Sequence, residues 1–295
     1  MQAFHSFWSA PHCMKNNHHI EIPDYELLVL MLSALKWKQL NGPIKMITDS
    51  AGAAFFVENG LENLWSEPMD TSLDGLDGSI DPFLFWAAGK LYALERVSCP
   101  CVMLDTDMII WKDINDLLQQ DTVAAHAESL SGAVYPDTDV FQMRQGYIFP
   151  REWDFSVDPV NTAFLYIRDP DLKDYYVKSA FAFMGALERA DVNPVISMCF
   201  AEQRILPMCV AARSGHMAYL LNAQNMYQQQ LVTHLWGYKR VLSKSQAERD
   251  LFCAKCIKRI LLEYPEWEPV LARNIQIRRH FIKYKSGLAG RRIKR

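Results

Sequence analysis

The stretch that most constrains the fold is the apolar run Val102–Ile110, which two acids interrupt at Asp105 and Asp107. An apolar run of this length is typical of a strand that is buried in a sheet. Carboxylates inside such a run are costly to bury unless a positive group meets them. The pattern therefore predicts that the two acids lie where a parallel strand ends, the edge at which open α/β sheets bind their ligands.

Two aspartates separated by one residue offer the hard oxygen ligands that Mg²⁺ and Mn²⁺ prefer. Such ions are typically held by one or two carboxylates together with substrate phosphates. We therefore expect Asp105 and Asp107 to hold a divalent cation, and through it a diphosphate. A second D-x-D, Asp137–Asp139, follows Tyr-Pro in a loop with no strand before it, so we interpret it as turn chemistry.

The first half of the chain alternates strand patterns with helix patterns. Asp24 after Pro23 is a good N-cap, and Asp81 is followed by Pro82 at the first helical position. Strands are expected at 2–8, 44–48 and 102–110, and helices at 25–40, 51–59 and 83–97. This alternation predicts an α/β fold with a mixed, mainly parallel sheet and helices on both faces.

The second half is less regular. Strands are expected at 122–127 and 160–167, and helices at 172–190 and from the Ser245–Glu248 capping box to Tyr264. The long connection Val134–Pro159 is rich in aromatic residues, and long ordered loops are usually functional. Pro265 and Pro269 separate a tail, so we expect one domain at residues 1–264 and a helical C-terminal extension at 265–295.

The tail differs from the body in charge. The chain carries a net charge of −3, but residues 273–295 contain nine Lys or Arg and no Asp or Glu. Basic residues alternate there with Ile277, Phe281, Ile282 and Tyr284, which suits an amphipathic segment on an anionic membrane surface. A solvated, disordered end is the alternative. A nucleic-acid arm is disfavoured, because the acidic body would resist it.

Cysteine usage and hydropathy point to a cytoplasmic protein with reduced thiols. The seven cysteines form no disulfide framework, and no signal-peptide pattern opens the sequence. The longest apolar run, Leu27–Leu35, is too short to span a bilayer. Cys253 and Cys256 resemble half of a zinc site, but they share a helical face with apolar residues, so we interpret them as core residues.

Several polar residues stand out against apolar surroundings. Lys90 projects from the apolar face of the expected helix 83–97, where a lysine requires an anion. Its stem could pack there while its amine pairs with a structural acid, or the amine could reach a nucleotide diphosphate. Further along are Asn161-Thr-Ala before a strand, the pair Glu202-Gln203 after a helical run, and His234-Leu-Trp-Gly-Tyr-Lys239. A histidine can complete the coordination of an ion, although a lone histidine is more often structural.

In this order the motifs resemble those of the GT-A-fold glycosyltransferases, most closely the retaining galactosyltransferase and glycogenin-like group. In that group D-x-D is followed by N-[AT]-[GA] opening a strand, by an acid-Gln pair and by H-x-x-G-x-x-K. The resemblance covers roughly residues 1–240. In this chain Lys239 comes one residue earlier than in that motif, and Glu replaces the more common Asp of the pair.

The resemblance implies a role for each motif. Asp105, Asp107 and His234 would be the ligands of Mn²⁺ or Mg²⁺. Lys239 would touch the diphosphate of the donor, and Asn161, Glu202 and Gln203 would line the sugar and the reaction centre. We also assign Phe4 and Ser6 of the first expected strand, together with Lys90 and Asp105, to the donor site.

The expected activity is metal-dependent transfer of a hexose from a nucleotide diphosphate sugar to a glycan or lipid-linked acceptor, as in surface polysaccharide synthesis. The aromatic connection 134–159 would hold the acceptor sugar. The basic tail would dock at the inner face of the membrane, by likeness to the C-termini of those enzymes. Two alternatives stay open: a nucleotide-sugar-binding protein without catalysis, and a haloacid-dehalogenase-like phosphatase.

Overall fold

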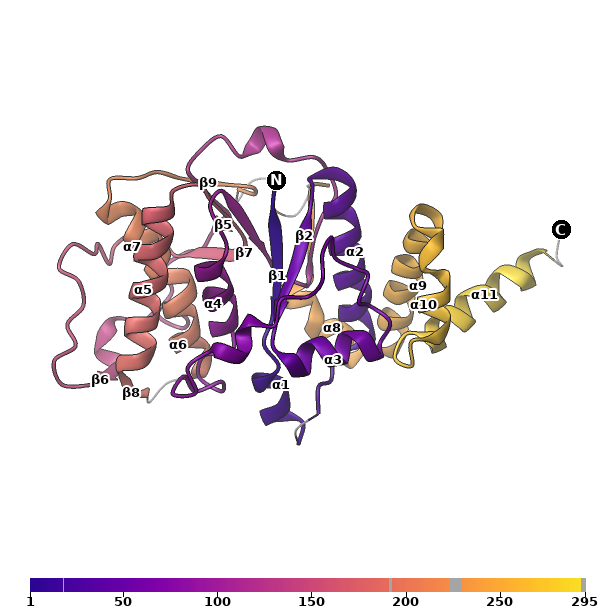
Figure 1. The fold of residues 1–295 in the computed structure, drawn as a ribbon, viewed down its shortest axis with the longest axis horizontal. Helices are drawn as coiled ribbons and strands as arrows, with labels where there is room; N and C mark the ends of the chain where they lie inside the picture. The colour runs from indigo at the N-terminus through magenta and orange to yellow at the C-terminus, as the bar shows by residue number, and fades with distance from the viewer. Residues whose placement is uncertain (18, 191–192, 223–225, 227–229, 293–295) are drawn as a thin grey trace.

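The centre of the molecule is a six-stranded mixed sheet in the order β2-β1-β3-β7-β5-β9 (Figure 1). The computed structural model describes all residues except 18, 191–192, 223–225, 227–229 and 293–295. The strands are β1 (Ala3–Phe7), β2 (Ile44–Thr48), β3 (Cys101–Leu104), β5 (Thr122–Ala127), β7 (Val160–Ile167) and β9 (Met217–Tyr219). All neighbours pair in parallel except β7, which is antiparallel to both β3 and β5. The predicted mixed, mainly parallel sheet is therefore confirmed.

The sheet is covered on both faces, as the buried strand patterns predicted. Buried apolar side chains form two core clusters, one on each face of the sheet. Successive side chains of a strand point to opposite faces, so Val102 and Leu104 belong to the first core cluster and Met103 belongs to the second. The first cluster includes α2 (Asp24–Leu40), and the second includes α4 (Ala88–Arg96), α5 (Pro170–Ala186) and α7 (Ile205–Ala212). Helix α2 is buried on nearly every side, because α9 (Gln246–Glu263) packs against it as well (Figure 1). The shorter helices α1 (Ala10–Lys15), α3 (Ser50–Glu58), α6 (Pro194–Cys199) and α8 (Lys239–Lys244) lie between these elements along the chain.

The expected single strand across the two acids is wrong. Strand β3 ends at Leu104, and a turn closed by the Met108 amide and the Asp105 carbonyl (3.1 Å) leads into β4 (Met108–Ile110). Strand β4 leaves the main sheet and pairs antiparallel with β10 (Val232–His234), with Met108 opposite His234. An apolar run cannot distinguish one long strand from two short ones, since pairing with the distant β10 decides where the first strand ends.

Two expected helices also have different limits. Helix α4 begins at Ala88 rather than Phe83, because Asp81 forms a turn in which its carboxylate accepts from the Phe83 amide (2.8 Å). Helix α5 ends at Ala186, and the following residues form β8 (Leu187–Ala190), which pairs with β6 (Phe141–Met143). A local turn thus shortens the first helix, and pairing with a distant strand ends the second.

The C-terminal residues form a helical extension, as predicted. Helix α9 is followed by α10 (Glu268–Arg273) and α11 (Arg278–Arg292), and α11 extends away from the rest of the molecule (Figure 1). Leu271, Ile277 and Phe281 nevertheless pack in the first core cluster. The domain boundary at residue 264 stays a prediction. Cys253 and Cys256 are buried, as expected, and all seven cysteines are free.

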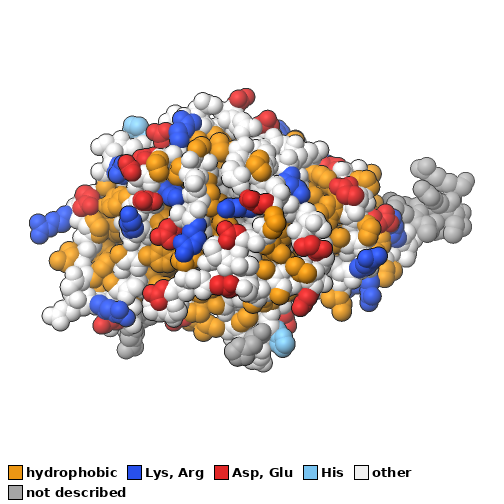
Figure 2. All heavy atoms as spheres, in the orientation of Figure 1, with side chains coloured by type: hydrophobic (Ala, Val, Ile, Leu, Met, Phe, Trp, Pro, Cys, Tyr) orange, Lys and Arg blue, Asp and Glu red, His pale blue; other side chains and the backbone are white. Residues whose placement is uncertain are grey.

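One continuous helical stretch, Pro194–Ala212, is long and apolar enough to cross a membrane, and 72% of it is buried inside the molecule. It consists of α6, a π-helical turn at Phe200–Arg204 and α7. Burial of this kind is typical of a core helix. On the outer surface seen in Figure 2, basic and acidic side chains lie beside one another with apolar side chains between them.

Candidate active site

A cleft of about 470 Å³ opens where β1 and β3 end. Nine of the predicted site residues line this one cleft, although they come from widely separated parts of the chain. They are Ser6, Lys90, Asp105, Asp107, Asn161, Glu202, Gln203, His234 and Lys239. A larger cavity of about 860 Å³ lies between α3 and α10 and is lined by none of them. The grouping of chemically active side chains, rather than size, identifies the smaller cleft as the candidate site.

The two acids and the histidine meet because β4 pairs with β10. This pairing sets His234 beside Asp107, with 3.5 Å between imidazole Nε2 and carboxylate Oδ1. One ligand atom from each of Asp105, Asp107 and His234 lies within 4.8 Å of the others. Ligands at about 2.1 Å from one octahedral cation lie about 3 to 4 Å apart. The two carboxylates and one imidazole therefore fit Mn²⁺ or Mg²⁺ by type and spacing.

Lys239 neutralises Asp107 on the other side of the carboxylate. Its ammonium lies 2.8 Å from Asp107 Oδ2 and 3.0 Å from Glu26 Oε2. Burial by itself raises the pKa of Asp107, but the hydrogen bond from His234 and the charge of Lys239 outweigh it, so the pKa lies below its ordinary value. Asp107 is consequently an anion that stays charged in a buried position, which suits a cation ligand.

Lys90 occupies the corresponding place beside Asp105. Its ammonium lies 2.6 Å from Asp105 Oδ1 and also bonds to Glu202, whose carboxylate accepts from the Thr162 hydroxyl (2.6 Å). Burial raises the pKa of Asp105 more than the charge of Lys90 lowers it. Burial lowers the pKa of Lys90, but the two carboxylates reverse this effect and hold it above its ordinary value. The lysine therefore has acidic partners, as its position on an apolar helix face required.

Glu202 and Gln203 are presented by the π-helical turn at Phe200–Arg204 between α6 and α7. Such turns interrupt an α-helix by one residue and occur frequently at functional sites. The Tyr176 hydroxyl donates to the Glu202 carbonyl (2.7 Å), and the Tyr135 hydroxyl donates to Gln203 Oε1 (2.6 Å). The two side chains are thus held in fixed positions at the wall of the cleft.

The structure separates two residues of β1 that we assigned to the donor site. Ser6 lines the cleft, whereas the side chain of Phe4 is fully buried in the second core cluster and does not reach it. Asn161 lies at the start of β7 and lines the cleft; its side-chain oxygen accepts from the Ala163 amide (3.0 Å). Both side chains point to the same face of β1, and they differ because Ser6 lies nearer the carboxyl end of the strand, where the cleft opens.

Other cleft residues were not predicted. Trp8, His12, Lys15, Trp86 and Trp236 line the same cleft. Trp236 lies inside the motif His234–Lys239, so the motif pointed to its neighbourhood. Glu26, which pairs with Lys239, lies in the first turn of α2, where no sequence pattern distinguished it from an ordinary helix-start acid.

The aromatic connection 134–159 is largely used for packing. Trp153 is buried, and the Phe149 ring contacts those of Trp153, Phe183 and Phe200 at centroid distances of 5.8–6.3 Å. Tyr135 is the member of this connection that bonds to a predicted site residue, Gln203. The second D-x-D lies at a short 3₁₀ turn that begins at Thr138, and both of its acids are exposed, which agrees with turn chemistry.

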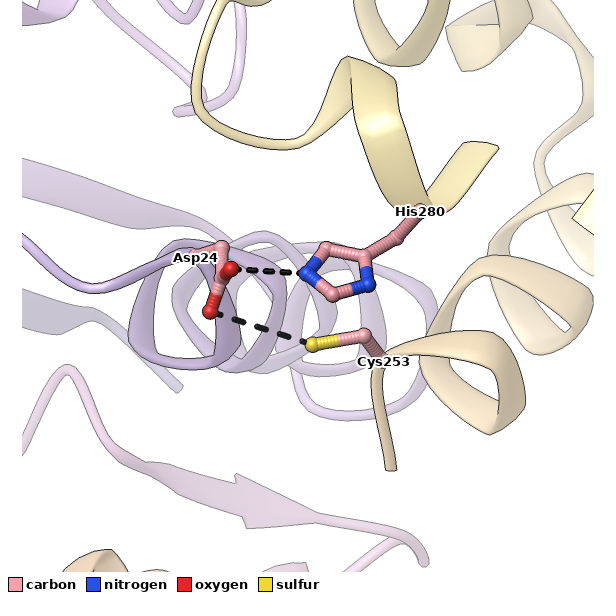
Figure 3. A group of neighbouring side chains, drawn as sticks. All are labelled: Asp24, Cys253 and His280. Carbon is pink, nitrogen blue, oxygen red and sulfur yellow. Dashed lines mark hydrogen bonds and ion pairs between the residues drawn. The ribbon is translucent and has the colours of Figure 1, made fainter. Parts of the chain in front are cut away.

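A second group of potential ligands, Asp24, Cys253 and His280, lies between α2, α9 and α11 (Figure 3). Asp24 Oδ1 accepts from the Tyr25 amide (2.7 Å) and Arg249 (2.6 Å). Asp24 Oδ2 accepts from Arg279 and His280, both at 2.7 Å. Because both oxygens are already used and two guanidinium groups oppose a cation, this cluster joins helices instead of offering a metal site.

Comparison with known proteins gives a family match and distant structural likenesses. The model of a family of unknown function, DUF6734, matches residues 1–271. No curated protein sequence matches this chain.

Among solved structures, galactosyltransferase LgtC in complex with donor and acceptor sugar analogs is similar at 12% identity, over 74% of this chain and 73% of LgtC, with a TM-score of 0.33. Mouse xyloside xylosyltransferase 1 is similar at 10% identity, over 75% of this chain and 85% of that protein's chain, with a TM-score of 0.39. Glycosyltransferase GlyE of Streptococcus pneumoniae TIGR4 is similar at 13% identity, over 75% of this chain and 45% of GlyE, with a TM-score of 0.34. Likenesses of this size carry no argument about activity.

Proposed function

The chain belongs to the family of unknown function DUF6734, and we propose from its cleft that it is a metal-dependent glycosyltransferase of the GT-A fold. One observation carries this proposal. Asp105 and Asp107 lie in the turn between β3 and β4, and His234 lies more than a hundred residues later at the end of β10, yet their ligand atoms come within 4.8 Å of one another. Two carboxylates and an imidazole at this edge suit a cation that carries a nucleotide diphosphate.

The chemistry divides between the cation and the cleft residues. When bound by Asp105, Asp107 and His234, Mn²⁺ or Mg²⁺ would stabilise the negative charge that develops on the leaving diphosphate. Lys239, which reaches Asp107 from the opposite side to His234, is placed to bind a phosphate oxygen. Lys90 would pair with Asp105 and also interact with the bound donor. Electrostatic stabilisation of a leaving group is usually the largest contribution in such a site.

The reacting sugar would lie between the acids and the π-helical turn. There Glu202 and Gln203 would stabilise the positive charge that develops at the anomeric carbon, analogous to the oxocarbenium-like centre of glycoside hydrolysis. Asn161 would bind a sugar hydroxyl. The bond from the anomeric carbon to the diphosphate breaks, and a bond to an acceptor hydroxyl forms.

The proposed substrates are a nucleotide diphosphate hexose and a glycan or lipid-linked acceptor, as in surface polysaccharide synthesis. We place the protein in the cytoplasm, with α11 at the inner face of the membrane, because its basic residues suit anionic lipids. A nucleotide-sugar-binding protein that does not transfer sugar is the second candidate. It is supported by Lys90 and Lys239, which already neutralise both aspartates in the structure.

Removal of one carboxylate tests the proposal. Asp107→Asn should lower Mn²⁺-dependent turnover of nucleotide sugars at least a hundredfold, because the cation loses a charged ligand and Lys239 loses one of its two carboxylate partners. The measurement is hydrolysis of a panel of nucleotide sugars with Mn²⁺, together with Mn²⁺ binding followed by electron paramagnetic resonance.

The matched control is Asp139→Asn in the exposed second D-x-D, which should retain parental activity and Mn²⁺ binding. Unchanged turnover in Asp107→Asn would refute the metal assignment. A parent that binds Mn²⁺ and nucleotide sugars but releases no product would instead favour the binding protein.

A further inference from the structure

An exposed tryptophan stands at the cleft beside the candidate metal ligands. Trp236 is 58% exposed, lines the cleft and follows His234 by two residues. Single exposed apolar residues are common and need no explanation on an open surface. The cleft also contains carboxylates, amides, lysines and the less exposed rings of Trp8 and Trp86. The exposed indole of Trp236 is available there to a ligand that has both apolar and hydroxyl-bearing surfaces.

Trp236 is held in place by the local backbone. Residues Trp236–Tyr238 form a 3₁₀ turn, and the amides of Tyr238 and Lys239 donate to the Leu235 carbonyl at 2.7 and 3.2 Å. The His126 ring lies beside the indole at a centroid distance of 6.3 Å and an angle of 60°. The 3₁₀ turn and the His126 ring therefore position the side chain of Trp236 and leave it exposed.

The sheet order separates Trp236 from the nucleotide half of the cleft. Strands β1 and β2 are parallel and joined through α2, the arrangement in which α/β sheets bind a nucleotide, and Ser6 and Trp8 line the cleft there. Trp236 contacts His126 on β5, which lies three strands from β1 on the other side of β3 and its acids. A group bound at Trp236 would thus approach the reaction centre from the side opposite to the nucleotide.

A carboxylate lies beside His126, the ring that contacts Trp236. Glu128 follows β5, its amide donates to the Pro159 carbonyl (2.8 Å), and its Oε1 lies 3.6 Å from His126 Nδ1. Its side chain keeps 22% of its surface exposed. An aromatic face for C–H groups and a carboxylate for hydroxyl groups are the two kinds of contact that a pyranose can use. The aromatic rings of the connection 134–159 are mostly packed on one another and cannot replace this face.

We infer that Trp236 is the platform for the acceptor sugar, and that the acceptor is a pyranoside with an unbroken C–H face and not a peptide or a simple alcohol. This inference rests on the proposed transferase function and adds the residue that selects its acceptor. Trp236 acts on binding of the second substrate, so donor binding and donor hydrolysis should not depend on it.

The test compares three variants at two positions of one short turn. Trp236→Leu removes the ring and keeps apolar bulk, while Trp236→Tyr restores an aromatic face. Tyr238→Leu is the matched control, because Tyr238 is 40% exposed in the same turn and does not line the cleft. Each variant is assayed for Mn²⁺-dependent hydrolysis of the nucleotide sugar and for transfer to methyl β-glucoside, methyl β-galactoside and glycerol.

Trp236→Leu should raise the KM for the methyl glycosides about tenfold while leaving donor hydrolysis within twofold, and Trp236→Tyr should recover most of the loss. Saturation-transfer NMR with the methyl glycosides should show binding to the parent and to Tyr238→Leu but not to Trp236→Leu. Equal transfer by the parent and Trp236→Leu would overturn the inference, as would equal losses of hydrolysis and transfer. If the parent hydrolyses no donor, the proposed function fails, whereas the NMR comparison still decides whether Trp236 binds sugar.

Discussion

Beneath the two acids, the fully buried His5 of β1 belongs to a chain of hydrogen bonds that ends on the strand after Asp107. His5 Nδ1 accepts from Trp65 Nε1 (3.2 Å), so its proton is on Nε2, which faces the Ser33 hydroxyl at 3.0 Å. Ser33 in turn donates to the Met108 carbonyl (2.5 Å). Burial lowers the pKa of His5 from 6.5 to about 3, although Asp107 acts in the opposite direction.

This arrangement predicts a loss of stability in mild acid. Below about pH 6.5 the unfolded chain takes up a proton at His5, while the folded protein does so only near pH 3. Stability therefore falls as the pH decreases through this window, by about 2 kcal/mol between pH 7.5 and pH 5. Urea unfolding at the two pH values should show that His5→Asn loses this part of the dependence.

The control for this prediction is His216→Gln, because His216 is exposed. An identical pH dependence in the parent and His5→Asn would contradict the buried neutral imidazole.

Lys90 shows how far a single residue can be predicted. Its place on an apolar helix face predicted an anionic partner, and Asp105 and Glu202 provide two. Which anion the ammonium meets could not be predicted, because Glu202 is brought to it by a π-helical turn that no sequence period indicates.

At the scale of elements, the N-terminus of α2 connects the C-terminal helices to the body of the molecule. Asp24 is buried there, and its carboxylate joins Arg249 of α9 to Arg279 and His280 of α11 (Figure 3). Burial raises the pKa of Asp24, but hydrogen bonds from His280 and Arg249 outweigh it and hold the pKa well below its ordinary value. Glu26, two residues further on in the same first turn, pairs with Lys239 beside Asp107.

Asp24→Asn should destabilise the protein by about 3 kcal/mol or more, because it leaves two guanidinium groups and an imidazole without their shared anion. The change is measured by urea unfolding at pH 7, with the exposed Asp116→Asn as control. A difference of less than about 0.5 kcal/mol between the two variants would show that the cluster does not hold the helices.

At the scale of the whole molecule, charge and shape are distributed unequally. Helix α11 extends away from a body whose sequence is acidic (Figure 1), and the last residues of the sequence, 291–295, are mostly basic. Its first turns are nevertheless part of the fold, since Ile277, His280 and Phe281 are buried. A truncation at residue 270 would therefore damage the core as well as the tail.

Membrane attachment is tested by a shorter deletion of residues 287–295. The full chain should float with vesicles that contain phosphatidylglycerol and not with pure phosphatidylcholine, and high salt should release it. The deletion should reduce flotation strongly while leaving the unfolding midpoint unchanged. Equal flotation of both proteins would contradict a role for the tail.

The sequence by itself determined the α/β class, most strand and helix positions, and the residue types that gather in the cleft. It did so because buried strands, helix caps and interrupting acids leave local patterns. The tertiary structure alone decided that the run Val102–Ile110 divides into two strands and that β10 returns beside β4. It also decided that Phe141 and Trp153 of the connection 134–159 are buried while Trp236 stays exposed. These outcomes depend on pairing and packing between distant segments, which no local pattern records.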